Sequence, residues 1–157
     1  MISIDLCMNF FKKHYLKISA VIGAVVVIAV AGHVFSHFGT NRRTFVFPVS
    51  GSKWNRTEVR YLTSDPVQGK IPCYVDELIL GPSFYRGRPL FTLGTRVEYC
   101  FLRNKTLYVG LSEEASLQEN GAPSVVEGVA LFKKNIKRNF TGIKYIELFI
   151  DGNLIPD

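Results

Sequence analysis

Histidine is scarce in this 157-residue sequence, which contains three, all in its first part at His14, His33 and His37. Everything after His37 therefore lacks the commonest general base, and no Ser-His-Asp or Cys-His arrangement can form there. His33 and His37 are four residues apart, but no third ligand lies nearby, so we predict no metal site.

The sequence also lacks the motifs that hold common cofactors, since it has no Walker loop, no dinucleotide fingerprint and no C-x-x-C pair. Adjacent carboxylates occur at Asp76-Glu77 and at Glu113-Glu114. Either pair could serve acid/base chemistry, but carboxylates of this kind are ordinarily solvated. We therefore predict a non-catalytic protein that needs no cofactor, with a carboxylate-dependent hydrolase as the less favoured alternative.

Cysteine is as rare as histidine, with Cys7, Cys73 and Cys100. Three cysteines do not make a disulfide framework. Cys73 and Cys100 could pair only if the fold brings their Cα atoms within about 7 Å of each other. The alternative is two separate buried thiols that pack as small hydrophobic side chains. The sequence leaves both outcomes open.

Charge is moderate in amount and basic in balance. The chain is 47% hydrophobic and 20% charged, with a formal net charge of +6. Such a composition is that of a folded protein rather than a disordered one. The basic excess is compatible with an anionic lipid or polymer as partner, and it does not indicate nucleic acid.

One long apolar run is present. Residues 18–38 contain no Asp, Glu, Lys or Arg, and about 20 such residues cross a hydrocarbon core of about 30 Å as a helix. Because Lys12, Lys13 and Lys17 precede the run, we expect residues 1–17 to be cytoplasmic and the rest of the chain to lie outside. The run therefore predicts an N-terminal transmembrane helix. The small-x-small pattern Ala29-Val30-Ala31 leaves a cleaved signal peptide open.

Residues 39–55 are predicted to be a linker. Phe45 to Phe47 could form a short strand, but two arginines precede it and Pro48 follows it, which favours an extended tether. Residues 56–157 then form the predicted domain.

Hydrophobic periodicity predicts an α+β domain with the element order β-α-β-β-α-β. Alternation indicates strands at 57–62, 96–102, 106–111 and 145–150, and helical spacing indicates helices at 73–80 and after Ser124. The second helix begins with Ser124 and Glu127 in a capping-box spacing. Its apolar stripe is Val125, Val129, Phe132, Ile136 and Phe140. We expect a small, mostly antiparallel sheet with both helices on one face.

Several segments resemble the GerMN domain, a family named for sporulation and spore germination proteins. Residues 75–82 (VDELILGP) resemble its first helix, and residues 93–95 (LGT) its entry to the second strand. Residues 107–112 (LYVGLS) resemble its third strand. Residues 140–142 (FTG) and 149–152 (FIDG) resemble its helix exit and its last strand.

The resemblance implies a non-catalytic, extracytoplasmic module of a bacterial envelope protein, held as a single-pass protein in the inner membrane. It implies a fold similar to the ring-building modules of envelope-spanning complexes. The expected partner is an unidentified envelope protein that the module helps to assemble or position. A cell-wall or other anionic polymer is the alternative partner, and a second copy of the chain is a further candidate.

Two basic features are candidate interaction surfaces. The first is the loop Ser83–Phe91, in which Phe84, Tyr85, Arg86 and Arg88 supply the residue types enriched at interfaces. The second is the polar face of the second helix, with Lys134, Lys137 and Arg138 beside Lys133. Each also has a purely structural explanation, because loop aromatics often pack on a sheet and basic residues stabilise helix C-termini.

Overall fold

The computed structural model describes residues 19, 21–32, 41–117 and 123–156. The chain divides into two compact units, Met1–Thr40 and Asn41–Asp157. Each unit is described by itself.

The predicted transmembrane helix over 18–38 is wrong for the residues that the structure describes. In the first unit the backbone is helical at Ser19 and through residues 21–32. Twelve consecutive residues rise about 18 Å, which is short of the about 30 Å of a hydrocarbon core. No described helix has both the length and the apolar character that a membrane crossing requires. The rest of the predicted span, at 18, 20 and 33–38, lies outside the described residues.

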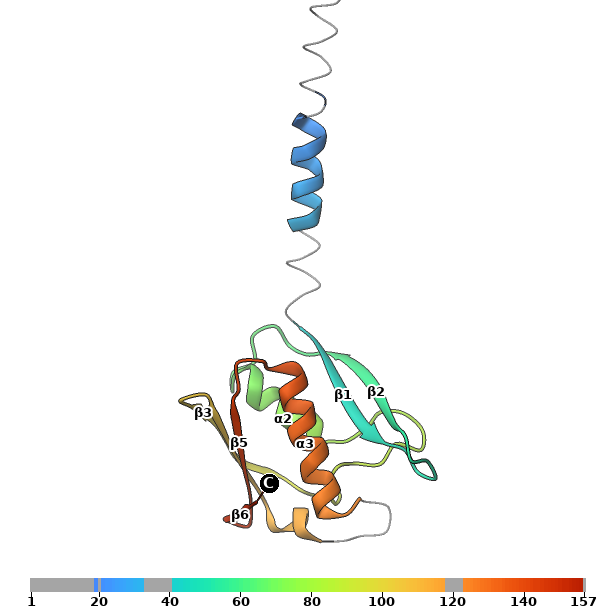
Figure 1. Cartoon of the computed structure of the whole chain (residues 1–157), viewed down its shortest axis with the longest axis vertical. Helices are drawn as coiled ribbons and strands as arrows, with labels where there is room; N and C mark the ends of the chain where they lie inside the picture. The colour runs from blue at the N-terminus through green and yellow to red at the C-terminus, as the bar shows by residue number, and fades with distance from the viewer. Residues whose placement is uncertain (1–18, 20, 33–40, 118–122, 157) are drawn as a thin grey trace, which may run out of the picture. The chain divides into compact units, whose positions relative to one another are not determined.

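The second unit contains two sheets and two α-helices within its described residues (Figure 1). Its elements in chain order are β1 (Arg42–Pro48), β2 (Asn55–Tyr61), α2 (Lys70–Ile79), β3 (Val97–Arg103), β4 (Thr106–Leu111), the 3₁₀ helix η1 (Glu113–Ser116), α3 (Val125–Asn139), β5 (Tyr145–Ile150) and β6 (Asn153–Ile155). The α+β class, both helices and the four predicted strands are confirmed. The expectation that these strands form one sheet is wrong, because the first of them, β2, belongs to a separate sheet with β1.

The strands form a two-stranded hairpin and a four-stranded sheet. β1 and β2 pair antiparallel, and the larger sheet has the order β3-β4-β5-β6. Within it, β3–β4 and β5–β6 are antiparallel, while β4 and β5 are parallel. A parallel pair needs a long crossover connection, which here runs through η1 and α3.

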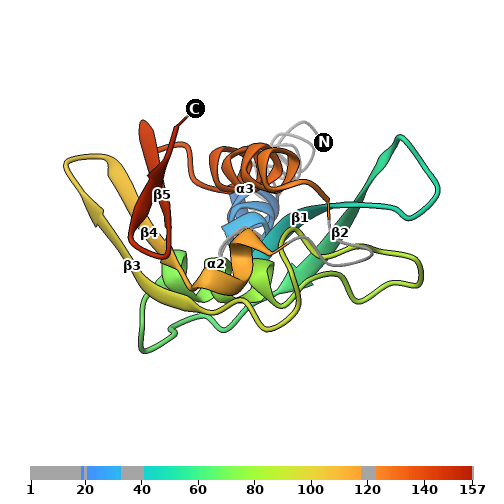
Figure 2. The ribbon, with the colours of Figure 1, turned by 90° about the horizontal axis from the view of Figure 1, so that it is seen from below.

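The two helices lie between the two sheets. In Figure 1, and again in the view from below in Figure 2, α2 and α3 separate the β3–β6 sheet from the β1–β2 hairpin. Fully buried side chains come from every layer, including Phe45 of β1, Tyr74 of α2, Phe132 of α3 and Leu148 of β5. The helices therefore cover one face of the four-stranded sheet, as expected, and the hairpin covers the helices.

The prediction of an extended tether over 39–55 is wrong, because the seven residues of β1 lie within it. Phe45 and Phe47 are 0% exposed and Val46 is 4% exposed, so this strand contributes to the core. Pro48 did not prevent the strand, since it stands at the last position of β1. A proline is tolerated where a strand ends.

Asparagine side chains of α3 complete the hydrogen bonding of β1 on the edge away from β2. Asn135 Oδ1 accepts from the Val46 N–H at 2.8 Å, and Asn135 Nδ2 donates to the Val46 carbonyl at 2.9 Å. Asn139, one helical turn later, makes the same pair of bonds to Thr44, at 3.0 and 2.7 Å. Burial raises the pKa of Tyr74, so its hydroxyl stays protonated and donates to the Thr44 carbonyl at 2.9 Å.

Turn and cap residues behave as their chemistry predicts. Ser124 Oγ accepts from the Glu127 N–H at 3.3 Å and begins α3. Asn104 and Lys105, with φ values of 50° and 65°, form the two-residue connection between β3 and β4. Asp151 and Gly152, with φ values of 50° and 72°, form a similar two-residue connection between β5 and β6. The sequence did not predict strand β6.

The boundary of the folded unit can be tested by truncation. We predict that residues 41–157 fold cooperatively, whereas residues 56–157, which lack β1, do not. Removing Phe45, Val46 and Phe47 loses about 5 to 9 kcal/mol of apolar burial, comparable to the whole stability of a typical domain. Circular dichroism during urea unfolding provides the measurement. A cooperative transition for 56–157 would contradict the assignment of β1 to the core.

A second prediction concerns Asn135. Asn135→Ala leaves the N–H and C=O of Val46 unpaired in the core, and each buried unsatisfied group costs about 1–3 kcal/mol. We expect the free energy of unfolding to fall by about 2 to 6 kcal/mol in urea titrations of residues 41–157. Asn139→Ala is the matched control and should cost less, because Asn139 is only partly buried. Equal losses in the two variants would contradict this interpretation.

Candidate interaction surfaces

The backbone of the loop Ser83–Phe91 is bound to the hairpin. The N–H of Ser50 donates to the Arg86 carbonyl at 2.8 Å, and the N–H of Arg88 donates to the Pro48 carbonyl at 2.9 Å. Between these bonds, Val49 and Gly87 form an isolated β-bridge. Arg86 itself has a φ of 65°, a left-handed conformation that is uncommon for a residue with a side chain. The loop is therefore held by the end of β1.

An ion cluster on β2 holds the start of the same loop. Glu58 accepts from the Ser83 hydroxyl at 2.6 Å and from the Ser83 N–H at 3.1 Å, and it pairs with Arg60 at 2.7 Å. Arg60 also pairs with Glu77 at 3.1 Å. Burial raises the pKa of Glu58, but the bonds from Arg60 and Ser83 outweigh burial and leave that pKa lowered. Glu77, one of the carboxylates considered for acid/base chemistry, is thus part of a structural ion pair.

The four loop side chains predicted to bind a partner do not act as one surface. Tyr85 is 90% exposed, and Arg86 is also exposed. Phe84 is half-buried, packs against the core and lies 4.8 Å from the guanidinium of Arg56. Arg88 is half-buried as well. Whether Tyr85 and Arg86 bind a partner stays a prediction.

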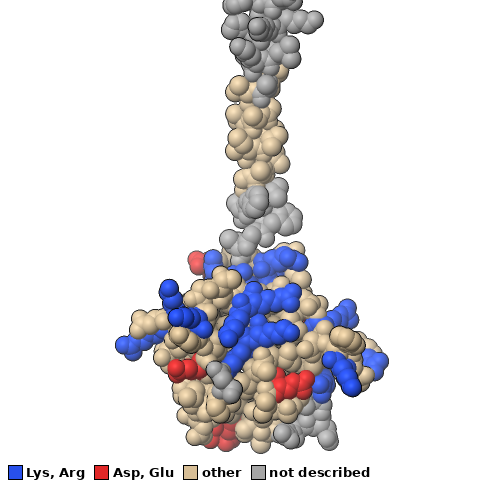
Figure 3. Space-filling view, viewed as in Figure 1, with Lys and Arg blue, Asp and Glu red and all other residues tan. Residues whose placement is uncertain are grey.

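The basic face of α3 is exposed where the sequence placed it. Lys134, Lys137 and Arg138 are exposed, and they line a shallow depression together with Lys133. Figure 3 shows Lys and Arg gathered over the part of the surface where α3 lies in Figure 1.

A second depression adjoins this face, between α3 and the beginning of β5. We call it the basic hollow, and it has a volume of about 230 Å³. Its lining includes Lys133 and Lys137 of α3, Lys144 before β5, Thr106 of β4, and Glu147 of β5. The sequence analysis did not predict that Thr106 and Lys144 would join the helix lysines.

A third surface was also missed, on the face of the four-stranded sheet that points away from the helices. We call it the aromatic face, and it consists of Tyr99, Phe101, Tyr108 and Phe149. The ring of Tyr99 lies 6.0 Å from that of Phe101 and 6.2 Å from that of Phe149, and Phe101 stacks on Tyr108 at 5.2 Å. The Tyr99 ring also covers Gly110, where a Cβ would clash with it. Phe101 is nevertheless 49% exposed.

The thiols of Cys73 and Cys100 lie in the part of the chain that the structure describes. Cys73 and Cys100 are both unpaired. Burial raises the pKa of both, in Cys100 to about 12, so neither is a ready nucleophile near neutral pH. Among the described residues, no three His, Cys, Asp or Glu side chains are grouped so that they could hold a metal ion.

Comparison with known proteins does not name a family. No family model and no curated protein matches the chain. A crystal structure from Clostridium perfringens described as a "Putative Lipoprotein" is similar with a TM-score of 0.40 and 14% sequence identity, over 73% of this chain and 78% of that chain. That score is too low to establish a shared fold. The GerMN resemblance therefore stays a prediction.

The pH dependence of stability tests the ion cluster that holds the loop. Because the pKa of Glu58 is lowered on folding, its contribution to stability is present above the unfolded pKa of about 4.3 and is lost as pH falls through the lower folded value. We predict that Glu58→Gln is destabilising at pH 7 and that its difference from wild type shrinks towards pH 3. Urea unfolding at several pH values provides the measurement. Glu98→Gln, at an exposed carboxylate, is the control, and an equal pH effect in both variants would contradict the role of Glu58.

Proposed function

We propose that this chain is a non-catalytic protein-interaction module that contributes to an assembly in the bacterial cell envelope, and that its partner protein docks on the aromatic face. The observation that carries the proposal is the exposure of clustered rings at positions where an antiparallel sheet facing water usually has polar residues. Tyr and Phe are enriched in protein interfaces relative to the rest of the surface.

Exposed apolar area extends beyond the four rings. Leu154 of β6, which pairs with Phe149, is 54% exposed, and Tyr145 of β5 is 56% exposed. Contiguous apolar surface of this kind marks interaction sites more often than isolated exposed side chains do. A partner that covered this face would remove the rings from water.

The adjacent edge of the sheet supports the same proposal. β3 pairs with β4 on one side, and no described strand pairs with its other side. Its central residues, Tyr99 to Leu102, carry no charge, and Leu102 is 48% exposed. An unpaired strand edge is a template for a strand from another chain. The register of β3 with β4 shifts between Val97 and Tyr99, so regular pairing with a strand from another chain is limited to the part of β3 that follows this shift.

Support for a non-catalytic role comes from the chemistry that the unit offers. Residues 41–157 contain no histidine. Glu58 and Glu77 are engaged by Arg60, and Glu114 by Arg96 at 3.6 Å. The placement in the envelope rests on the GerMN resemblance alone.

Site-specific photo-cross-linking in cells that produce the chain tests the docking surface and captures the partner in the same experiment. p-Benzoylphenylalanine is placed at Phe101, at Tyr85 in the loop, and at Val67, which is fully exposed and serves as control. We expect a defined protein adduct from position 101 and not from position 67. Mass spectrometry then identifies the partner.

Affinity measurements with that partner complete the test. Phe101→Ser should weaken binding by about 2 kcal/mol, or about 30-fold, if the ring is a hot spot, while the melting temperature stays close to wild type. An adduct from position 85 but not from 101 would make the loop the docking surface and overturn the proposal. Equal yields from 101 and 67 would overturn it as well.

A further inference from the structure

The basic hollow carries an inference that does not depend on the aromatic face. It exists because the sheet is incomplete beside α3. β6 pairs only with residues 148–150 of β5, so residues 145–147 have no strand on that side within the described sheet. Lys133 and Lys137 of α3 border this gap together with residues of β5. The result is a concave site rather than a flat helix face.

The lysines around the hollow are not explained by helix stability alone. A cation near the end of α3 interacts favourably with the helix dipole, which accounts for Lys137 and Arg138. However, Lys133–Lys137 and Lys134–Arg138 are like-charged pairs four residues apart, and such pairs destabilise a helix. Lys144 lies outside the helix altogether. The concentration of basic side chains on α3 therefore lowers the stability of this helix.

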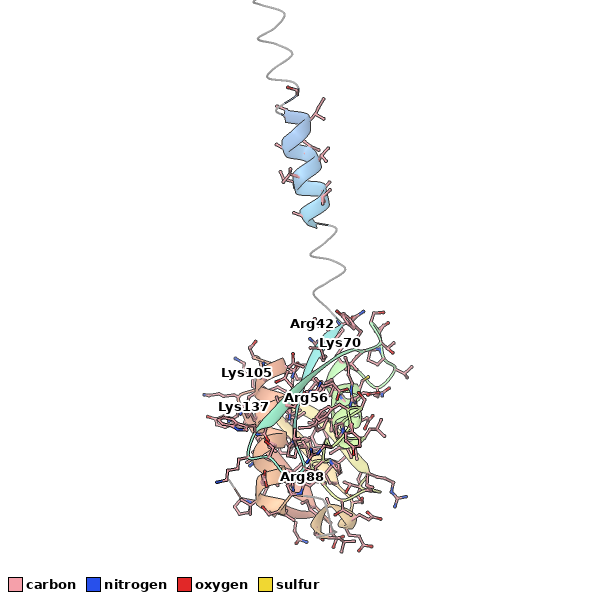
Figure 4. All side chains as sticks on the ribbon, turned by 90° about the vertical axis from the view of Figure 1, so that its right-hand side faces the viewer. Arg42, Arg56, Lys70, Arg88, Lys105 and Lys137 are labelled. Atoms are coloured by element: carbon pink, nitrogen blue, oxygen red, sulfur yellow. The ribbon has the colours of Figure 1, made fainter. Side chains whose placement is uncertain are left out.

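The crossover connection brings Lys144 to this position. The N–H groups of Lys144 and Tyr145 donate to the Lys105 carbonyl at 2.8 and 3.2 Å, which fixes the start of β5 beside the β3–β4 turn. Figure 4 shows Lys105 and Lys137 on the same side of the unit, whereas Arg88 lies at its lower end. Residues from three separate parts of the chain therefore meet at one site.

We propose that the basic hollow binds the phosphate group of a phosphate ester. Each lysine supplies up to three N–H donors from a compact charge. Lysine binds phosphate as a point charge, so lysines from different elements can contact different oxygens of one phosphate group. A volume of about 230 Å³ equals about eight water molecules at about 30 Å³ each, which accommodates the phosphate and the first atoms of its ester.

An NMR titration tests this proposal with residues 41–157, which contain the buried hydrophobic cluster found among the described residues. The probe is glycerol 1-phosphate, and glycerol is the uncharged control. We expect saturating shifts of the backbone amides of Thr106, Lys137 and Lys144 with the phosphate ester and none with glycerol. Shifts that do not saturate, or that map away from the hollow, would overturn the proposal.

Matched charge variants separate a site from general attraction. Lys137→Gln with Lys144→Gln should weaken binding at least about tenfold, since the pair removes two charged donors from the hollow. Lys53→Gln with Lys70→Gln removes the same charge at exposed positions elsewhere and should change affinity less than about twofold. Lys137→Arg with Lys144→Arg keeps the charge and should retain most of the binding. Equal losses in the two glutamine pairs would overturn the proposal.

Lipid vesicles distinguish the source of the phosphate group. If the hollow takes soluble esters, phosphatidylglycerol vesicles should not compete with glycerol 1-phosphate. If it also takes lipid headgroups, they should compete, and phosphatidylcholine vesicles should not. Binding to phosphatidylglycerol vesicles that is unaffected by the Lys137/Lys144 glutamine pair, with no response to glycerol 1-phosphate, would mean a general basic surface and would overturn the site.

Discussion

The side-chain amide of Asn135 paired with both backbone groups of Val46 is the interaction on which the rest of the second unit depends. Strand β1 is buried, and a buried strand edge needs a partner for every N–H and C=O group. No third strand is available beside the hairpin within the described sheet, so an amide side chain, which carries a donor and an acceptor, takes that place. Asn139 extends the arrangement to Thr44. The hairpin can therefore cover the helices, and the core closes.

Elements with a strong local pattern were predicted correctly, and β1 shows why others were not. The stripe through Val129, Phe132 and Ile136 and the alternation in β5 are visible within a few residues, because side-chain periodicity is a local property. The partners of β1 on the α3 side lie 89 and 95 residues further along the chain. A pattern around Phe45 could not reveal them, and the neighbouring Pro48 favoured the wrong interpretation. The prediction of a transmembrane helix over 18–38 was wrong for a similar reason. The absence of charged residues from a segment does not by itself determine the length of the helix that the segment forms.

The sequence predicted a candidate surface correctly only where all of its residues lie on one helix or strand. The basic face of α3 could be read from helical spacing, whereas the basic hollow required the crossover that brings Thr106 and Lys144 to Lys137. In β3, four uncharged residues in a row, Tyr99 to Leu102, hide which side chains point outward. Composition also misled the interpretation of the loop, because Phe84 is covered by Arg56 and contributes packing rather than open surface.

The distance along the chain between β1 and its asparagine partners also sets an order of events during synthesis. Ribosomes add about 5–20 residues each second, so the 89 residues between Val46 and Asn135 correspond to about 4 to 18 seconds. During that interval the hairpin has emerged with Phe45 and Phe47 uncovered and with one strand edge unpaired. Nascent chains of this protein thus carry an unpaired strand edge, which is a site for mispairing, until α3 is made.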